Sequence, residues 1–308
     1  MRTCLRLLCS VLFASALTAS IASAQTAASG MAFLKFGAGG RSIAMGDAAV
    51  ASSTLGEALY YNPARASADG RSALTAMYQD YIQDITTSYL GGVAQFDGWT
   101  LGVHMGLTTV RDIEIRDVPG EPMGRFDSQN FSGGITLATA IADDVHAGVT
   151  FKYLYEKIFV DDAGGYGVDV GLAYRTGADA AYLPTSIGAA LANLGSMSPL
   201  RTEATELPTI IRYGAAWSLP IEALRGGLNI EANGVGMLRE KSHHLHVGAE
   251  LDYEQSLFLR AGYMTGYDVK GLTAGFGASY AMLRIDYAVT PFSENFGTAH
   301  TVSVSLQL

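Results

Sequence analysis

The segment His300-Thr301-Val302-Ser303-Val304-Ser305-Leu306-Gln307-Leu308 ends the chain and alternates apolar with polar residues. In a β-strand, successive side chains point to opposite faces, so the valines and leucines form one apolar face and the serines and the glutamine line the other. Similar alternation recurs between Ala73 and Leu308, with small or charged residues on the second face. This repetition is typical of a transmembrane outer-membrane β-barrel, which has lipid outside, a polar lumen inside and no unpaired strand edge.

The alternating segments predict an all-β fold of about 14 antiparallel strands, which together occupy residues 71–308. Each strand and its connection share roughly 17 residues, enough for a strand of about 10 residues. A soluble β-sandwich could contain single segments of this kind, but it would rarely contain so many with so little turn material on one side. The predicted strands are 72–79, 86–96, 99–109, 129–141, 145–157, 166–176, 185–194, 208–219, 226–236, 243–253, 257–266, 271–280, 283–290 and 299–308.

The connections between these strands differ in length in a regular way. Long connections rich in polar residues, Gly or Pro include Val110–Ser128, Gly195–Leu207 and Pro291–Thr298. Short turns such as Asp97-Gly98 and Ala281-Met282 alternate with them along the chain. Long loops on one side and short turns on the other are typical of an outer-membrane barrel whose termini both face the periplasm.

The start of the chain has the features of a secretory signal peptide, which we predict for residues 1–24. Arg2 and Arg6 precede a short apolar run, and Ala22-Ser23-Ala24 has the form of a cleavage site. The alternative is an N-terminal membrane anchor, which the shortness of the apolar run disfavours. No later run reaches the roughly 18 apolar residues of a membrane helix. An exported chain without such a helix is expected to be either a periplasmic β-protein or a bacterial outer-membrane barrel.

Composition restricts the function further. Both cysteines, Cys4 and Cys9, lie in the predicted signal peptide, so the mature chain has no disulfide and no thiolate metal site. Removal of the signal peptide would move the formal net charge from −9 to −11, because that segment holds two arginines and no acids. An acidic chain with 36 glycines and 16 tyrosines argues against nucleic acid as a partner.

Residues 25–70 do not alternate, and they contain several compact motifs. These are Phe33-Leu34-Lys35, Gly39-Gly40-Arg41-Ser42, Met45-Gly46-Asp47-Ala48-Ala49-Val50-Ala51 and Tyr61-Asn62-Pro63-Ala64. Pro63 disfavours helical geometry at Asn62, so the last motif predicts a turn. The motifs together resemble the N-terminal signature of the PorV/PorQ family of outer-membrane proteins, and they are closer to PorV.

The resemblance implies a fourteen-stranded barrel like that of the FadL-type channels, in which residues 25–70 form a hatch that plugs the lumen near the periplasm. It also implies a role in type IX protein secretion, as a shuttle or adaptor that hands secreted proteins to the surface attachment machinery. Its partners would be outer-membrane lipid, the secretion translocon and secreted proteins with C-terminal signal domains. The motif residues that carry the resemblance are Phe33, Leu34, Gly40, Arg41, Met45, Gly46, Asp47, Asn62, Pro63 and Ala64.

The long connection Val110–Ser128 is a candidate partner-binding loop, because partners commonly bind to loops on a rigid barrel. It is more apolar than a simple solvated loop, and the alternative is that it folds inward and caps the lumen. Its candidate contact residues are Ile113, Ile115, Val118, Met123 and Phe126.

A FadL-like channel for the uptake of hydrophobic small molecules is the alternative function, and a purely structural barrel is a third hypothesis. A channel would need a continuous apolar pocket in the lumen, yet the inward positions are largely polar, which favours the adaptor. For a channel we expect a lateral opening at an interrupted strand such as the one containing Gly133-Gly134.

The sequence predicts no enzyme, no cofactor and no metal site. His244 and His246 share a strand face, but a third metal ligand is not evident. A Gly-x-Ser-x-Gly elbow, which would mark a hydrolase, is absent from the sequence. We expect the lumen charges to pair with one another or with the hatch, because an unpaired charge there would be costly. They are Lys152, Glu156, Asp169, Arg175, Arg212, Glu231, Glu250, Asp252, Arg260, Arg284 and Asp286.

Overall fold

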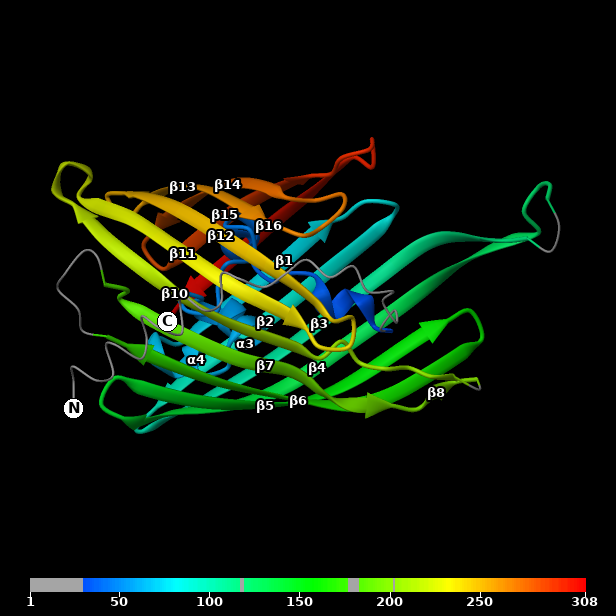
Figure 1. Cartoon of the computed structure of the whole chain (residues 1–308), viewed down its shortest axis with the longest axis horizontal. Helices are drawn as coiled ribbons and strands as arrows, with labels where there is room; N and C mark the ends of the chain where they lie inside the picture. The colour runs from blue at the N-terminus through cyan, green and yellow to red at the C-terminus, as the bar shows by residue number, and fades with distance from the viewer. Residues whose placement is uncertain (1–29, 117–118, 177–182, 202) are drawn as a thin grey trace.

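In the computed structural model, the chain forms a closed antiparallel barrel of fourteen strands, as the alternation predicts (Figure 1). The structure describes residues 30–116, 119–176, 183–201 and 203–308. The barrel strands are β1 (Ala73–Asp80), β2 (Ile85–Phe96), β3 (Trp99–Ile115), β4 (Gly124–Ala142), β5 (Val145–Ile158), β6 (Asp161–Arg175), β7 (Ser186–Met197), β10 (Ile210–Ile221), β11 (Gly226–Met237), β12 (Ser242–Tyr253), β13 (Leu257–Met264), β14 (Leu272–Tyr280), β15 (Leu283–Pro291) and β16 (Thr298–Gln307). Neighbours in this series pair around the barrel, and β1 closes it by pairing with β16.

The two faces of each strand follow the predicted alternation. On β16, Val302 and Val304 are 44% and 39% exposed, whereas Ser303 and Ser305 are almost fully buried. Inside the barrel, small hydroxyl groups pair across neighbouring strands, as between Thr136 and Thr150 (2.7 Å). Outward-facing apolar side chains include Leu74, Leu90, Val103, Met105, Leu107, Ile135, Leu137, Val149, Phe151, Leu172, Leu245, Leu251, Leu259, Phe276 and Ile285. An apolar exterior and a polar interior are what a membrane-embedded barrel requires.

Among the described residues, no helix combines the length and apolar character needed to cross a membrane.

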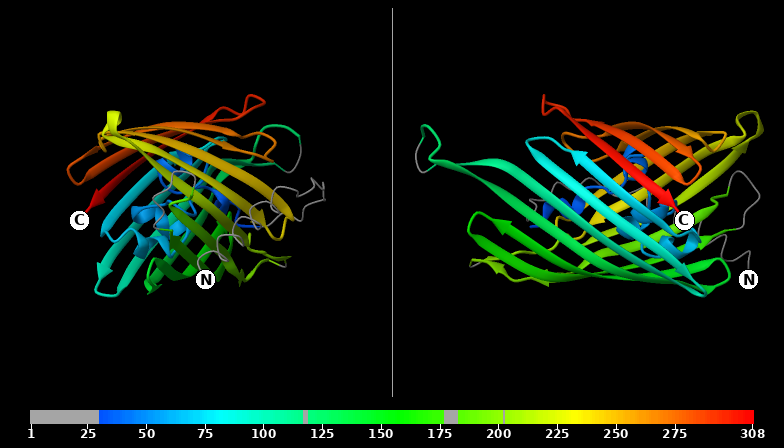
Figure 2. Two further views of the ribbon diagram at one scale, coloured as in Figure 1. Left: turned by 60° about the vertical axis from the view of Figure 1, so that its left-hand side comes forward. Right: turned by 180° about the vertical axis from the view of Figure 1, so that it is seen from behind.

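The barrel has two distinct ends, which Figures 1 and 2 show from different sides. One end holds the β1–β2, β3–β4, β5–β6, β7–β10, β11–β12, β13–β14 and β15–β16 connections, and we call it the loop end. The other end holds the remaining connections, the start of β1 and the end of β16, and we call it the turn end. β8 (Pro199–Leu200) and β9 (Glu203–Ala204) form a small separate sheet in the β7–β10 connection.

The prediction of a loop at Val110–Ser128 is wrong over much of its length. β3 extends to Ile115 and β4 begins at Gly124, so the two strands form a ribbon that projects beyond the rest of the barrel (Figure 1). The pairing continues there after a register shift between Val110 and Ile113, and Ile113 pairs with Phe126 across the ribbon. The Gly195–Leu207 connection is likewise shorter than predicted, because β7 continues to Met197.

The pairing of β7 with β10 is incomplete, and this place differs from the opening predicted at Gly133-Gly134. At Gly133-Gly134, β4 pairs without interruption with both β3 and β5, so the opening expected there is absent. Between β7 and β10, the pairing stops at Ala192 and Ile210. The last five residues of β7, from Asn193 to Met197, therefore have no strand partner on that side.

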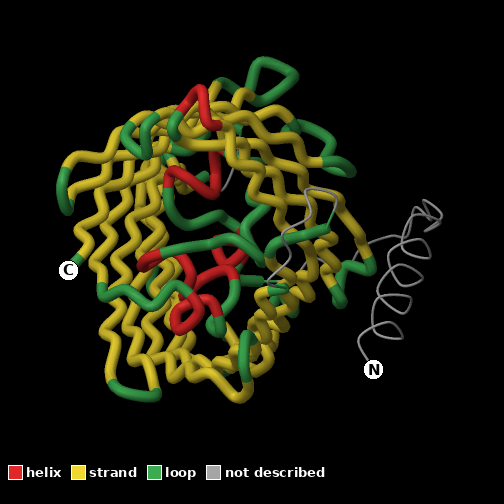
Figure 3. Tube along the Cα trace, turned by 90° about the vertical axis from the view of Figure 1, so that its left-hand side faces the viewer, coloured by secondary structure: helices red, strands yellow, loops and turns green. Residues whose placement is uncertain are grey.

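The N-terminal segment, residues 30–72, lies inside the barrel (Figure 3). It contains η2 (Ala32–Lys35), α2 (Gly40–Ala44), η3 (Leu55–Glu57), α3 (Ala58–Tyr61) and α4 (Arg65–Ala68). α2 contacts β13 to β16, whereas α4 contacts β3 to β6 on another part of the wall. The predicted signal peptide lies outside the described residues.

Glycines on the inner wall allow the backbone of this segment to approach closely. A Cβ on Gly188 would lie 2.2 Å from the carbonyl oxygen of Val50, and a Cβ on Gly262 would lie 2.1 Å from the backbone nitrogen of Gly46. Any side chain at these positions would force the segment away from the wall. Part of the high glycine content therefore serves the packing of the lumen.

Candidate functional site

A pocket lies in the lumen between the N-terminal segment and the wall strands β1 to β7 and β10. Its empty volume is about 570 Å³, which includes solvent-open space at its mouth. The N-terminal segment lines it with Phe33, Leu34, Phe36, Gly37, Ala38, Leu59 and Tyr60. The wall lines it with Met77, Thr87, Ser88, Tyr89, His104, Gly106, Thr108, Ser132, Lys152, Asp169, Ala192, Asn193 and Arg212.

Most of the apolar lining comes from the N-terminal segment rather than from the strands. Phe33 and Leu34 are buried in a cluster with Met31, and this cluster also packs against Met197 and Leu207 from the β7 side of the wall. Leu59 is fully buried in a separate cluster. The polar inner positions favour the adaptor when the strands are considered alone, but the non-alternating segment supplies apolar side chains to the lumen, so this argument against a channel does not hold.

One polar wall of the pocket is built around a β-bulge in β7. Asn193 has a positive φ of 63°, and the register between β6 and β7 shifts beside it. Its backbone N–H donates to Asp169 at 2.7 Å, and Lys152 donates to its side-chain oxygen. Lys152 and Asp169 form a buried ion pair at 2.8 Å. The bulge thus holds one cation and one anion in balance at the edge of the incompletely paired region.

Arg212 enters the pocket from β10 and, unlike Lys152, has no carboxylate partner in the described part of the chain. Its guanidinium carbon lies 5.2 Å from the ring centre of Tyr60 and 5.9 Å from that of Tyr61, a cation–π arrangement. Only 6% of Arg212 is exposed, and none of the ion pairs among the described residues includes it. Burial raises the pKa of Tyr60, so its hydroxyl stays neutral beside the guanidinium.

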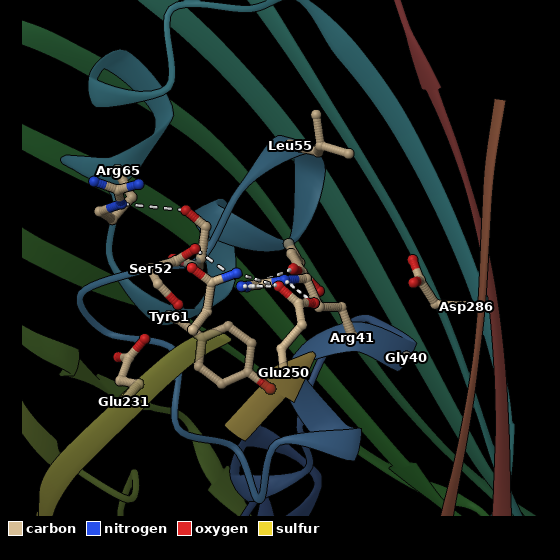
Figure 4. Close-up of polar contacts among 12 residues, drawn as sticks. Gly40, Arg41, Ser52, Leu55, Tyr61, Arg65, Glu231, Glu250 and Asp286 are labelled. Carbon is tan, nitrogen blue, oxygen red and sulfur yellow. Dashed lines mark hydrogen bonds and ion pairs between the residues drawn. The ribbon is translucent and has the colours of Figure 1, made fainter. Parts of the chain in front are cut away.

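A buried ion cluster fastens the N-terminal segment to the wall (Figure 4). Arg41 of α2 donates to both oxygens of Glu250, at 3.0 and 3.2 Å. Arg260 contacts Glu250 at 2.6 Å and Asp286 at 2.9 Å. The complete cluster contains three guanidinium groups and three carboxylates, so its charges balance: Arg41, Arg260, Arg284, Glu57, Glu250 and Asp286. The predicted pairing of lumen charges, with one another or with the hatch, is correct for Glu250, Arg260, Arg284 and Asp286 and for Lys152 with Asp169. It is wrong for Arg212 and Glu231, which are buried and form no ion pair among the described residues.

Glu57 is the weakly paired member of this ion cluster. Its closest cation is the guanidinium of Arg41, at 4.0 Å. Burial raises the pKa of Glu57 to about 7, and the charge of Arg41 opposes that rise only in part. The carboxyl group of Glu57 therefore titrates near neutral pH.

The motif residues of the predicted hatch lie at points where the segment attaches to itself or to the wall. The backbone N–H of Gly40 donates to Ser303 at 2.9 Å, and the hydroxyl of Tyr61 donates to Asp47 at 2.6 Å. The side-chain amide of Asn62 donates to the carbonyls of Val50 and of Leu172, at 2.9 and 3.0 Å. The backbone at Asn62 is extended, as the following proline predicts.

The candidate contact residues of the Val110–Ser128 region do not line the pocket. Ile113 and Ile115 lie in β3, Met123 immediately precedes β4, and Phe126 lies in β4. Phe126 packs against Phe159 with ring centres 5.2 Å apart. Val118 lies outside the described residues.

His244 and His246 face the same side of β12, as predicted. The ring of Tyr267 stacks on His244 at 4.0 Å, and its hydroxyl lies 3.1 Å from Nε2 of His246. The described residues contain no group of three or more His, Cys, Asp or Glu side chains placed to hold a metal ion.

The fold and the distribution of side chains define the class of the protein: it is a fourteen-stranded β-barrel of the bacterial outer membrane. Solved structures with a similar fold include the toluene transporter TodX of P. putida. TodX is 14% identical over 88% of this chain and 97% of its own, with a TM-score of 0.62. A deltaS2 mutant of TodX, a monoaromatic hydrocarbon channel, is 15% identical over 88% of this chain and 98% of its own, with a TM-score of 0.61.

At these identities the similarity shows the fold alone. No protein-family model matches the sequence, and no curated protein matches it either.

The sequence did not point to several pocket residues. Tyr60, Tyr89 and Asn193 carry no recognisable motif, and only the closed barrel brings them together. Arg212 is identifiable from sequence as an inward charge, but its lack of an acidic partner follows from the strand register and from the path of the N-terminal segment.

Proposed function

We propose that this protein is a non-enzymatic channel that admits small hydrophobic molecules through the outer membrane. The observation that carries the proposal is the pocket inside the barrel, lined by apolar and aromatic side chains of the N-terminal segment. Small-molecule sites are typically concave and mostly apolar, with a few polar groups that orient the ligand. The fold similarity to TodX, a toluene transporter, supports the same function.

We further propose that residues 25–70 act as a hatch and that the incompletely paired half of β7 is the exit. The pocket reaches this region through Ala192 and Asn193. On the inside, Phe33 and Leu34 of the N-terminal segment pack against Met197 of β7. A ligand in the pocket is therefore separated from the β7–β10 gap by the segment itself, and displacement of that segment would open the path.

Filling the pocket tests the channel function. A Cβ on Gly106 would meet only the carbonyl oxygen of Ser88, at 3.9 Å, so Gly106→Phe adds a ring to the pocket without a backbone clash. We expect this variant to reduce uptake of radiolabelled toluene by whole cells at least tenfold. The matched control is Gly92→Phe, whose Cβ would meet the side chains of Leu74 and Val103 on the outer face.

Both variants should reach the outer membrane as heat-modifiable barrels in equal amounts. Equal toluene uptake by Gly106→Phe, Gly92→Phe and the unaltered protein would contradict the channel function.

A shuttle role in type IX secretion is the second candidate, and the ribbon of β3 and β4 is the observation that favours it. Beyond the barrel, this ribbon has two strand edges that no neighbouring strand covers, and such edges can accept a strand from a partner. Met123 at its tip is 65% exposed. Deletion of Ile113–Phe126 should then leave the barrel folded and prevent co-purification of secreted proteins. If the deletion does not change which proteins co-purify, the ribbon has no such role.

A further inference from the structure

The buried guanidinium of Arg212 lacks a carboxylate partner. Elsewhere in the lumen, the buried cations Arg41, Lys152 and Arg260 each contact a carboxylate within 3.0 Å. Arg65 is also buried and forms no ion pair among the described residues, but it donates to the backbone carbonyl of Ser53 at 3.2 Å and does not line the pocket. The aromatic rings of Tyr60 and Tyr61 compensate only part of the cost of burying a charge. A site that holds an uncompensated cation in a pocket is suited to an anionic ligand.

The other charges near the pocket set the number of negative charges that it would accept. Lys152 and Asp169 neutralise each other at 2.8 Å, which leaves the single positive charge of Arg212 among the charged residues that line the pocket. Asp47 accepts a hydrogen bond from Tyr61 and lines a different, smaller cavity. One negative charge balances this site, whereas a doubly charged phosphate would leave excess negative charge close to Asp169.

The remainder of the pocket would surround an apolar body. Phe33, Leu34, Leu59, Met77 and Tyr89 all line it together with Arg212. Polar wall residues such as Thr87, Thr108 and Ser132 line the same pocket, so its limited apolar lining suits a compact group such as an aromatic ring better than a long chain.

From these observations we propose that the pocket binds monocarboxylates with a compact apolar body, such as aromatic acids, and that Arg212 recognises the carboxylate. The planar guanidinium can donate two parallel hydrogen bonds to a carboxylate, which a neutral hydrocarbon cannot accept. This inference rests on the proposed channel function and specifies the chemical class of its ligand.

The test compares benzoate with toluene, because the two differ by a carboxylate in place of a methyl group. Binding is measured by ligand-observed NMR on the full barrel in nanodiscs, for the unaltered protein and for Arg212→Met. We expect benzoate to bind the unaltered protein and to bind Arg212→Met about tenfold to a hundredfold more weakly. Toluene affinity should change less than about threefold, because it makes no use of the charge. The matched control is Arg225→Met, which removes an 81% exposed side chain at the turn end.

Two results would overturn the inference. If benzoate binds Arg212→Met as tightly as it binds the unaltered protein, Arg212 does not recognise the carboxylate. If toluene binds the unaltered protein and benzoate does not, the ligand class is wrong while the channel function stands. Failure of both ligands to bind would count against the channel function as well. Should Arg212→Met not fold, comparison of benzoate with neutral benzamide on the unaltered protein decides the question, since equal affinities would overturn it.

Discussion

At the scale of single residues, the lumen depends on balanced charge. Arg41 reaches from the N-terminal segment to Glu250, which also contacts Arg260 and Arg284 on the wall. Such a group of charges is stable out of water only when each carboxylate faces guanidinium groups at hydrogen-bond distance. The sequence predicts that inward charges pair, but it cannot give the partners, because these lie on four elements far apart in the chain.

Glu57 makes the attachment of the N-terminal segment sensitive to pH. Its pKa rises from an ordinary value of 4.5 to about 7, so the attached state binds a proton that the released state loses. The contribution of protonated Glu57 to the attachment of the segment is complete below pH 4.5, and it is lost as the pH rises through 7. We expect the free energy of releasing the segment to fall by about 3 kcal/mol over this range.

Native-state hydrogen exchange of the α2 amides, corrected for intrinsic rates, measures this free energy between pH 5 and 8. In Glu57→Gln the decline should disappear. A decline of the same size in Glu57→Gln would show that another group is responsible.

At the scale of elements, the N-terminal segment determines the character of the lumen. The strands alone would enclose a polar interior, as the alternation predicts. The segment adds Phe33, Leu34 and Leu59 and approaches the wall closely at glycines such as Gly188. Its motifs identify it in the sequence as a separate inner segment. Its path could not be predicted, because it depends on small side chains and backbone contacts that follow no periodic pattern.

A reversible cross-link tests whether this segment must move. A Cβ on Gly40 would lie 3.1 Å from the side-chain oxygen of Ser303, close to the spacing of a disulfide. It would also lie 2.9 Å from the backbone carbonyl oxygen of Asp286, so the new side chain requires a small displacement of α2 from the wall. In Gly40→Cys/Ser303→Cys, oxidation should lower toluene uptake at least tenfold, and reduction should restore it. Residues 25–308 contain no other cysteine, and the two single variants serve as controls. Uptake at the normal rate with the cross-link fully formed would show that the segment stays attached during transport.

The ribbon of β3 and β4 illustrates the limit of predicting strand ends from sequence. Charged residues and prolines between Val110 and Ser128 suggest a loop, yet Ile113 and Phe126 continue the paired pattern. Arg125 also contacts Asp112 at 3.4 Å and Glu114 at 3.5 Å across the ribbon. Cross-strand pairs of opposite charge compensate for the turn-forming composition.

At the scale of the whole molecule, the sequence predicts the architecture well, because alternation with a period of two is imposed on every strand by lipid outside and polar groups inside. The strand number and the closed antiparallel order follow from this constraint. The pocket does not follow from it, since it forms where the inner segment and the wall fail to fill the lumen.

Because the outer face of the barrel contacts lipid, a charge introduced there should destabilise the barrel more at the middle of the bilayer than near its surface. Ile135 lies on the outer face well within β4, whereas Ile141 lies on the same strand close to the turn end, and both are 59% exposed. We expect Ile135→Arg to lower the free energy of unfolding in lipid by about 2–4 kcal/mol, and Ile141→Arg by about 0–1 kcal/mol. Reversible unfolding by guanidinium in liposomes measures both values. Equal effects at the two positions would contradict the assigned membrane orientation of β4.

The proposed channel function requires that the pocket beside the N-terminal segment holds a small hydrophobic ligand. Diffusion of bromobenzene into crystals of the protein, followed by measurement of bromine anomalous scattering, tests it most directly. We expect an anomalous peak inside the lumen, among Leu59, Met77 and Tyr89, and loss of that peak in Gly106→Phe. Anomalous peaks confined to the outer apolar face, with none in the lumen, would contradict it.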